Sequence, residues 1–123
     1  MFHVEFFENS NGVKPFKKWL NSLANDQYVI VINKIENRLS VLGTALFATR
    51  ELKPLRSGVA EFVISVHQFE ARIFVHLAAG KVFWVLGAYK KSGHASKRIQ
   101  DLEIEKAVRA LLELKIQGVY LDT

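Results

Sequence analysis

The stretch VAEFVISVHQFEARIFVHLAAGKVFWVLGAY, residues 59–89, decides the fold. It contains three short segments rich in β-branched and aromatic residues, Val59–Val66, Ala71–Leu77 and Lys81–Tyr89, which are linked by the short sequences HQFE and LAAG. Segments of this composition are typical of strands, and connections this short imply antiparallel hairpins. The stretch therefore predicts a three-strand antiparallel meander.

The residues before the meander predict one strand and two helices. FHVEFF, residues 2–7, is rich in aromatic residues and alternates loosely, as a strand does. KPFKKWLNSL, residues 14–23, has its large apolar residues at helical spacing, with a proline that a first helical turn tolerates. Residues 27–43 contain the β-branched run YVIVI, but their apolar residues continue one helical stripe for four turns. We therefore expect a helix there.

The residues after the meander predict a C-terminal helix. DLEIEKAVRALLELK, residues 101–115, places apolar residues on one helical face, and Gly118 closes the segment. The order strand, two helices, meander and helix predicts a single α+β domain over residues 1–123. We expect its helices to pack on one face of an antiparallel sheet, which leaves the other face open for a ligand.

Composition narrows the class of protein. The chain has 123 residues, half of them hydrophobic, and no cysteine, which excludes disulfides and thiolate chemistry and favours a cytoplasmic location. It has no apolar run of the roughly 20 residues that a membrane span requires, so we expect no membrane partner.

Positive charge is concentrated in the centre of the chain. The net charge is +5, but residues 44–98 alone hold nine Lys and Arg against three Asp and Glu, a net charge of +6. The preceding residues carry +1 and the following residues −2. A clustered basic surface attracts polyanions, of which nucleic-acid backbones are the commonest, although a merely solvated basic face has the same composition.

The second strand of the meander carries an arginine at its centre. Alternation puts Arg72, Phe74 and His76 on one face of the sheet and a uniformly apolar set on the other. The apolar set should pack on the helices, so Arg72 is expected on the open, solvent-facing side. An arginine that extends its charged end past a sheet edge is the structural alternative.

Cations in the flanking loops are expected to converge on Arg72. They are Arg50, Lys53 and Arg56 before the meander, and Lys90, Lys91, His94, Lys97 and Arg98 after it. Because three separate stretches supply them, one concave cationic surface is a more specific prediction than a run of lysines on one helix would be.

Other chemistries have little support in the sequence. The four histidines lack metal-ligand spacing, and Glu61 is the one acidic residue in the predicted strands of the meander, so no pair of catalytic carboxylates is formed there. Neither a phosphate-binding glycine loop nor a nucleophile-elbow sequence is present. We expect neither a metal nor a cofactor.

Four motifs in succession resemble a known family. They are LKPLRSGVAEF (residues 52–62), ARIF (71–74), GAYKKS (87–92) and DLEIEKA (101–107). In order and spacing they resemble the HigB-type toxins of the RelE/ParE superfamily, which belong to bacterial type II toxin–antitoxin modules, in the branch also found in phages. The resemblance implies a RelE-like α+β fold. It further implies a metal-independent endoribonuclease that cuts messenger RNA, often on the ribosome, and that a helix-turn-helix antitoxin neutralises.

The resemblance also implies roles for individual residues. It gives Arg72 a role in stabilising the transition state, and it gives Lys90 and Lys91 contacts with phosphate. Lys53 and Arg56 match a basic loop of the family.

The chemistry of metal-free RNA cleavage adds candidates for proton transfer. The ribose 2′-OH attacks the adjacent phosphate, which requires a base, an acid and cations for the developing charge. His94 titrates near neutral pH when it is unperturbed. Lys91 is the next candidate because its cationic neighbour Lys90 favours loss of its proton. Tyr89 would stack on a base or donate a proton, unless it only packs in the sheet.

Two departures from the family keep other classes of function open. Val63 stands where many relatives have a basic residue, and His94-Ala95-Ser96 stands where they have Lys-Thr-Pro. These changes favour a non-enzymatic, ParE-like gyrase inhibitor, or an inactive relative that binds an antitoxin or nucleic acid. The cation cluster with Arg72 favours cleavage.

Overall fold

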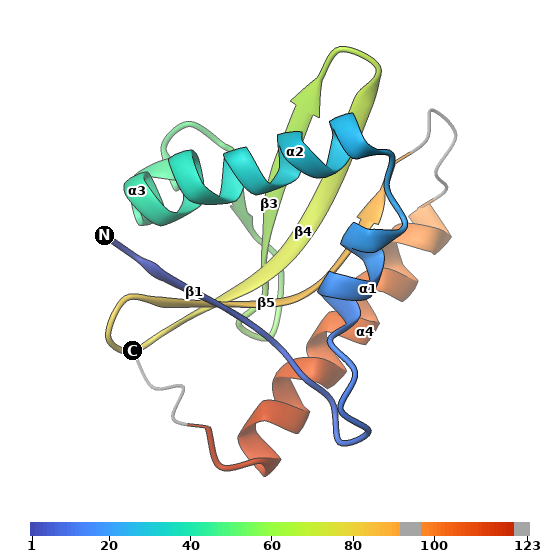
Figure 1. The fold of residues 1–123 in the computed structure, drawn as a ribbon. Coiled ribbons are helices and arrows are strands. Elements are labelled where there is room, and N and C mark those ends of the chain that lie inside the picture. Colours follow the sequence, from blue (N-terminus) through green and yellow to red (C-terminus); the bar gives the residue numbers. More distant parts are fainter. Residues whose placement is uncertain (92–96, 120–123) are drawn as a thin grey trace.

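The predicted meander forms the centre of a five-stranded sheet with the order β1-β5-β4-β3-β2 (Figure 1). The structure is a computed structural model and describes residues 1–91 and 97–119. The strands are β1 (His3–Phe6), β2 (Leu52–Pro54), β3 (Ala60–Val66), β4 (Phe69–Ala78) and β5 (Val82–Lys90). Pairing is antiparallel from β2 through β5, as the hairpin connections predict. The α+β class is confirmed.

The helices agree with the periodicity of the sequence. They are α1 (Pro15–Asn21), α2 (Asn25–Lys34), the π-helical η1 (Ile35–Leu39), α3 (Ser40–Leu42), the 3-10 helix η2 (Gly43–Phe47) and α4 (Lys97–Ile116). The run YVIVI lies in α2, so the four-turn stripe predicts its structure correctly and its β-branched composition does not. Val31, Ile35 and Leu39 of that stripe are buried in the core.

The expectation of a purely antiparallel sheet is wrong, because β1 pairs in parallel with β5. His3 lies opposite Val82 and Phe6 opposite Val85. The chain between these two strands includes the helices α1 to α3, which supply the long crossover that a parallel pair requires. The short edge strand β2 was also not predicted, because its residues Leu52–Pro54 read as part of a basic loop.

The N-terminal segment is fixed to α3, at the end of the continuous helical stretch that α2, η1 and α3 form. The Phe2 amide donates to the Ser40 carbonyl, and the Ser40 hydroxyl donates to the Phe2 carbonyl, both at 2.7 Å. The Phe2 ring lies directly over Gly43, where a Cβ atom would come within 2.0 Å of the ring. Gly43 has φ +50°, so glycine is required there both by conformation and by space.

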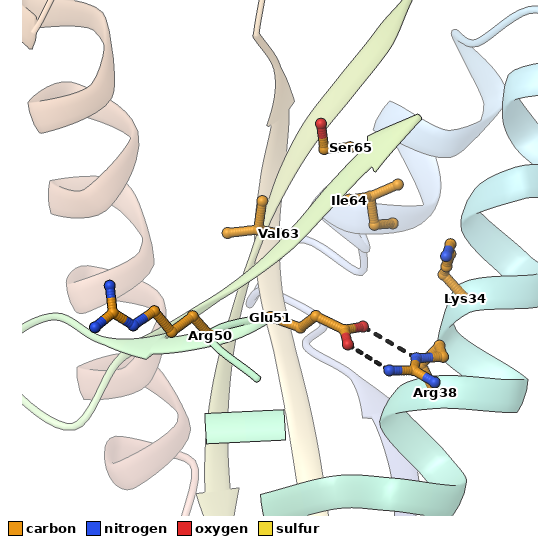
Figure 2. A pocket seen from close by; sticks show the side chains of 7 residues that line it. All are labelled: Lys34, Arg38, Arg50, Glu51, Val63, Ile64 and Ser65. Carbon is orange, nitrogen blue, oxygen red and sulfur yellow. Dashed lines mark hydrogen bonds and ion pairs between the residues drawn. The ribbon is translucent and has the colours of Figure 1, made fainter. Parts of the chain in front are cut away.

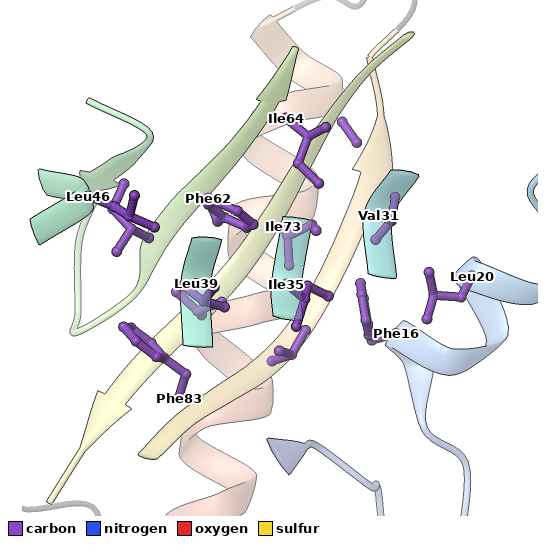
Figure 3. Packing of buried hydrophobic residues seen from close by; sticks show 14 of the residues in the cluster. Phe16, Leu20, Val31, Ile35, Leu39, Leu46, Phe62, Ile64, Ile73 and Phe83 are labelled. Atoms are coloured by element: carbon purple, nitrogen blue, oxygen red, sulfur yellow. The ribbon is translucent and has the colours of Figure 1, made fainter. Parts of the chain in front are cut away.

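Helices cover both faces of the sheet, so the expectation that they pack on one face is also wrong. Phe62, Ile73 and Phe83 point toward α1, α2 and η1, whereas α4 lies behind the strands (Figure 3). Phe74 points to the opposite face and belongs to a second core cluster with Leu111 of α4. Because alternation gives β4 a large apolar residue on each face, neither face can be left open to water.

A tight turn on one side and a β-bulge on the other set the positions of residues around β4. The hairpin between β3 and β4 has a two-residue turn at His67–Gln68, so β4 begins at Phe69 and includes Glu70. On the other side, Phe74 pairs with Gly87 while Val75 pairs with Val85, which leaves Leu86 as an extra, bulged residue in β5.

Candidate functional site

Arg72 lies near the hairpin end of β4 between two carboxylates. Its Nε atom lies 3.2 Å from Oε1 of Glu61, and its Nη2 atom lies 2.9 Å from Oε2 of Glu70. The Arg72 side chain is 12% exposed and that of Glu61 is 4% exposed. Charges this deeply buried are costly unless they are paired, so the contact between Arg72 and Glu61 is part of the folded structure.

This burial corrects the expectation that Arg72 stands on an open, solvent-facing strand. Phe74, two residues further along the same face, is buried beneath α4. His76, the next residue on that face, has Nδ1 2.6 Å from the Gly58 carbonyl oxygen. The sheet face is therefore closed along most of β4, and Arg72 reaches solvent only with a small part of its side chain.

Lys91 joins Arg72 through Glu70. The Lys91 amide donates to the Glu70 carbonyl at 2.9 Å, which extends the ladder by one residue beyond β5. The Lys91 Nζ atom lies 3.4 Å from Oε2 of Glu70, the same oxygen that Arg72 contacts. One carboxylate oxygen is thus held between two cations that come from adjacent strands.

Lys90 lies on the opposite side of the sheet from Lys91. Its Nζ atom donates to Oε1 of Gln27 in α2 at 3.3 Å and lies 5.9 Å from the centre of the Phe69 ring. Adjacent residues of a strand point to opposite faces, so only Lys91 shares the face of Arg72, although both lysines border the hollow beside the turn between β3 and β4. The structure brings Lys91 to Arg72 and separates Lys90 from it.

Tyr89 is the cross-strand neighbour of Arg72 and is buried. Its ring stacks on Phe74 at a centroid distance of 6.0 Å, and its hydroxyl has no hydrogen-bond partner among the residues that the structure describes. Burial raises the pKa of Tyr89, and the Glu61 carboxylate adds to this rise, while Arg72 partly opposes it. The hydroxyl therefore stays protonated at neutral pH and would act as a donor rather than as a base.

A second group of predicted cations lies where the basic loop meets α4. Arg56 pairs with Glu105 of α4 through Nη2 and Oε2 at 2.8 Å, and this contact lowers the pKa of Glu105. Lys97 and Arg98 begin the same helix and, with Arg56, line an open hollow of about 740 Å³. Lys53 is exposed on β2 opposite Glu61, on the sheet face that carries Arg72. These four cations share the α4 side of the sheet.

His94 lies outside the described residues. Within residues 1–91 and 97–119, no group of three histidine, aspartate or glutamate side chains is placed to hold a metal ion.

Sequence reasoning missed Glu70 and a further charged pocket. The sequence predicts a hairpin loop that includes Glu70, because HQFE carries no strong two-residue turn signal such as Asn-Gly. The pocket, of about 290 Å³, lies between η1 and the edge of β3, and in it Arg38 and Glu51 form a bidentate pair (Figure 2). Arg50 points away from that pair. No local pattern links Arg38 with Glu51, so only the fold reveals their contact.

No protein-family model matches the chain, and no curated protein sequence matches it. Among the described residues, no helix has the length and apolar character needed to cross a membrane.

Proposed function

We propose that the protein is a HigB-type toxin with a RelE-like fold, a metal-independent endoribonuclease that cleaves messenger RNA and pairs with a helix-turn-helix antitoxin. The observation that carries the proposal is the pair of cations, Arg72 and Lys91, that hold one anionic oxygen between them. A phosphodiester offers oxygens of the same charge and hydrogen-bonding capacity, and arginine matches them with a fork of donors.

The proposed reaction needs no group beyond the protein and the RNA. The 2′-oxygen forms a bond to phosphorus, the bond from phosphorus to the 5′-oxygen breaks, and a 2′,3′-cyclic phosphate and a 5′-hydroxyl result. Arg72 and Lys91 stabilise the negative charge that grows on the phosphorane. The protonated Tyr89 hydroxyl beside Arg72 and the imidazole of His94 are the candidates for proton transfer.

The remaining cations would hold the RNA strand. Lys53, Arg56, Lys97 and Arg98 share the α4 side of the sheet with Arg72 and Lys91, so a strand bound at the pair would pass near them. Lys90 points toward α2 but also borders the hollow that Glu70 and Lys91 line, so it would contact RNA that passes around the end of the hairpin.

Induced expression in a bacterium tests the proposal. Growth should stop and messenger half-lives should shorten, and purified protein with ribosomes should cut a reporter message. The variant His94→Gln should cleave at least tenfold more slowly if His94 transfers a proton. Arrested growth with intact messages and failing gyrase activity would instead establish a ParE-like gyrase inhibitor.

A second candidate follows from the burial of Arg72. An arginine that is 12% exposed and contacts two carboxylates also suits a non-catalytic relative that binds an antitoxin or nucleic acid. For such a protein, induced expression should leave both growth and messages unchanged, while binding to its partner remains measurable.

A further inference from the structure

The two carboxylates that contact Arg72 differ in their access to water. The Glu61 side chain is 4% exposed, whereas that of Glu70 is 32% exposed. Glu61 lies within β3, between its paired neighbours on β2 and β4, and Glu70 lies next to the two-residue turn at the end of the sheet. The same arginine is thus held on one side by a buried anion and on the other by an accessible one.

Glu61 is the fixed counter-ion. Its carboxylate cannot turn to water without disrupting the packing around it, so it remains paired with Nε of Arg72. This contact directs the outer edge of the guanidinium, with Nη2, toward the end of the sheet. Glu61 is accordingly a positioning residue for Arg72.

Glu70 is the displaceable anion. Its contacts with Arg72 and Lys91 are partly exposed, and exposed ion pairs contribute little to stability. Glu70 and Lys91 also line an open hollow of about 630 Å³ beside the turn, together with Ser65, Val66, Gln68, Phe69 and a second cation, Lys90. A ligand therefore has access to the place that the carboxylate occupies.

We propose that the Glu70 carboxylate occupies a phosphate-binding site formed by Arg72 and Lys91, and that a phosphate group binds by displacing it. Glu70 is then an internal competitor that weakens binding of every anionic ligand at this site. The statement that the natural ligand is an RNA phosphodiester rests on the proposed function, whereas the site itself rests on the geometry of the four charged groups.

Phosphate titration of the variant Glu70→Gln tests this inference. Two probes are used: inorganic phosphate, followed by NMR, and a 2′-O-methyl oligoribonucleotide that cannot be cleaved. Loss of a competitor equivalent to one partly exposed ion pair should tighten both by roughly two- to fivefold. The matched control is Glu103→Gln, which removes the same charge from α4, where the Glu103 side chain is 24% exposed and pairs with Lys106 at 3.2 Å.

A third variant tests the cations without disturbing the buried pair. Lys91→Gln changes a side chain that is 37% exposed, so the protein should fold normally. Phosphate binding should weaken severalfold, and the combined variant Glu70→Gln/Lys91→Gln should lose most of the gain of the single glutamate variant.

The outcomes separate this inference from the proposed function. Tighter phosphate binding in Glu70→Gln but not in Glu103→Gln supports the displaceable anion, even when the wild-type protein fails to cut RNA. Equal gains in both variants would mean that only net charge matters and would overturn the inference. Absence of phosphate binding in every variant, or weaker binding in Glu70→Gln, would overturn it as well, even if RNA cleavage is observed.

Discussion

Replacing Arg72 with alanine should destabilise the fold strongly, in contrast to what an arginine on an open sheet face would predict. The contact between Nε of Arg72 and Oε1 of Glu61 is 3.2 Å long, and Glu61 has almost no access to water. At an effective dielectric constant of about 20, two unit charges at this distance interact by about 5 kcal/mol. Removal of one partner from a buried pair costs about 3–5 kcal/mol, because the other charge is left without compensation. The total free energy of unfolding of most domains is only about 5–15 kcal/mol, so this loss is a large part of it.

Urea unfolding of Arg72→Ala at pH 7, followed by tryptophan fluorescence, measures this loss. The control Arg109→Ala breaks an exposed helical pair with Glu105, at 3.8 Å, and should cost less than about 1 kcal/mol. The double variant Glu61→Leu/Arg72→Met should recover most of the stability, since apolar side chains can replace a buried ion pair. A loss below about 1 kcal/mol in Arg72→Ala would refute the reasoning, and so would a double variant no more stable than the single one.

The other predictions concern binding, packing and acid stability. For binding of a non-cleavable RNA, Lys91→Ala should make the slope of log affinity against log salt concentration shallower by roughly 0.7. Lys90→Ala, on the opposite face, should change this slope much less. Equal changes in the two variants would contradict the assignment of faces. Gly43→Ala should lower the free energy of unfolding, measured by thermal unfolding, by about 2–4 kcal/mol, because φ at Gly43 is +50° and the Phe2 ring fills the space of a Cβ atom. The control Gly80→Ala, with open space around the residue, should lower it clearly less. The hydrogen bond from Arg38 lowers the pKa of Glu51, so the stability that this pair contributes is present above pH 4.5 and is lost as pH falls through the lowered pKa. The difference in unfolding free energy between wild type and Glu51→Gln, measured by urea unfolding, should therefore vanish in acid. A difference that persists in acid would exclude this origin.

Local patterns predicted most of the secondary structure, because each element repeats its signal several times. The stripe that includes Val31, Ile35 and Leu39 recurs over four turns and outweighs the strand propensity of YVIVI. The meander combines composition, alternation and short connections, which all favour the same arrangement. The C-terminal helix follows from the spacing of residues such as Ile104 and Leu111, although it begins four residues earlier than predicted, at Lys97.

The relations between elements were less predictable, since they depend on contacts between distant residues. Nothing in residues 2–7 specifies whether β1 runs parallel or antiparallel to β5. The uniformly apolar set on one face of β4 predicts helices on that face only, although Phe74 on the other face indicates that this side needs an apolar partner as well. The role of Glu70 depends on the length of one turn, which the sequence HQFE does not determine.

The bulge at Leu86 divides β5 into two halves that are out of phase. Before it, the odd-numbered Phe83 and Val85 face α1 and α2; after it, the even-numbered Ala88 and Lys90 face that way. Both halves nevertheless keep their partners on β4. A protein related to this one that lacks one residue at the bulge would still present the counterpart of Lys91 to Arg72. A deletion two or three residues later would exchange the two lysines between the faces. Insertions and deletions in β5 therefore differ in their effect on the site according to which side of Gly87 they fall.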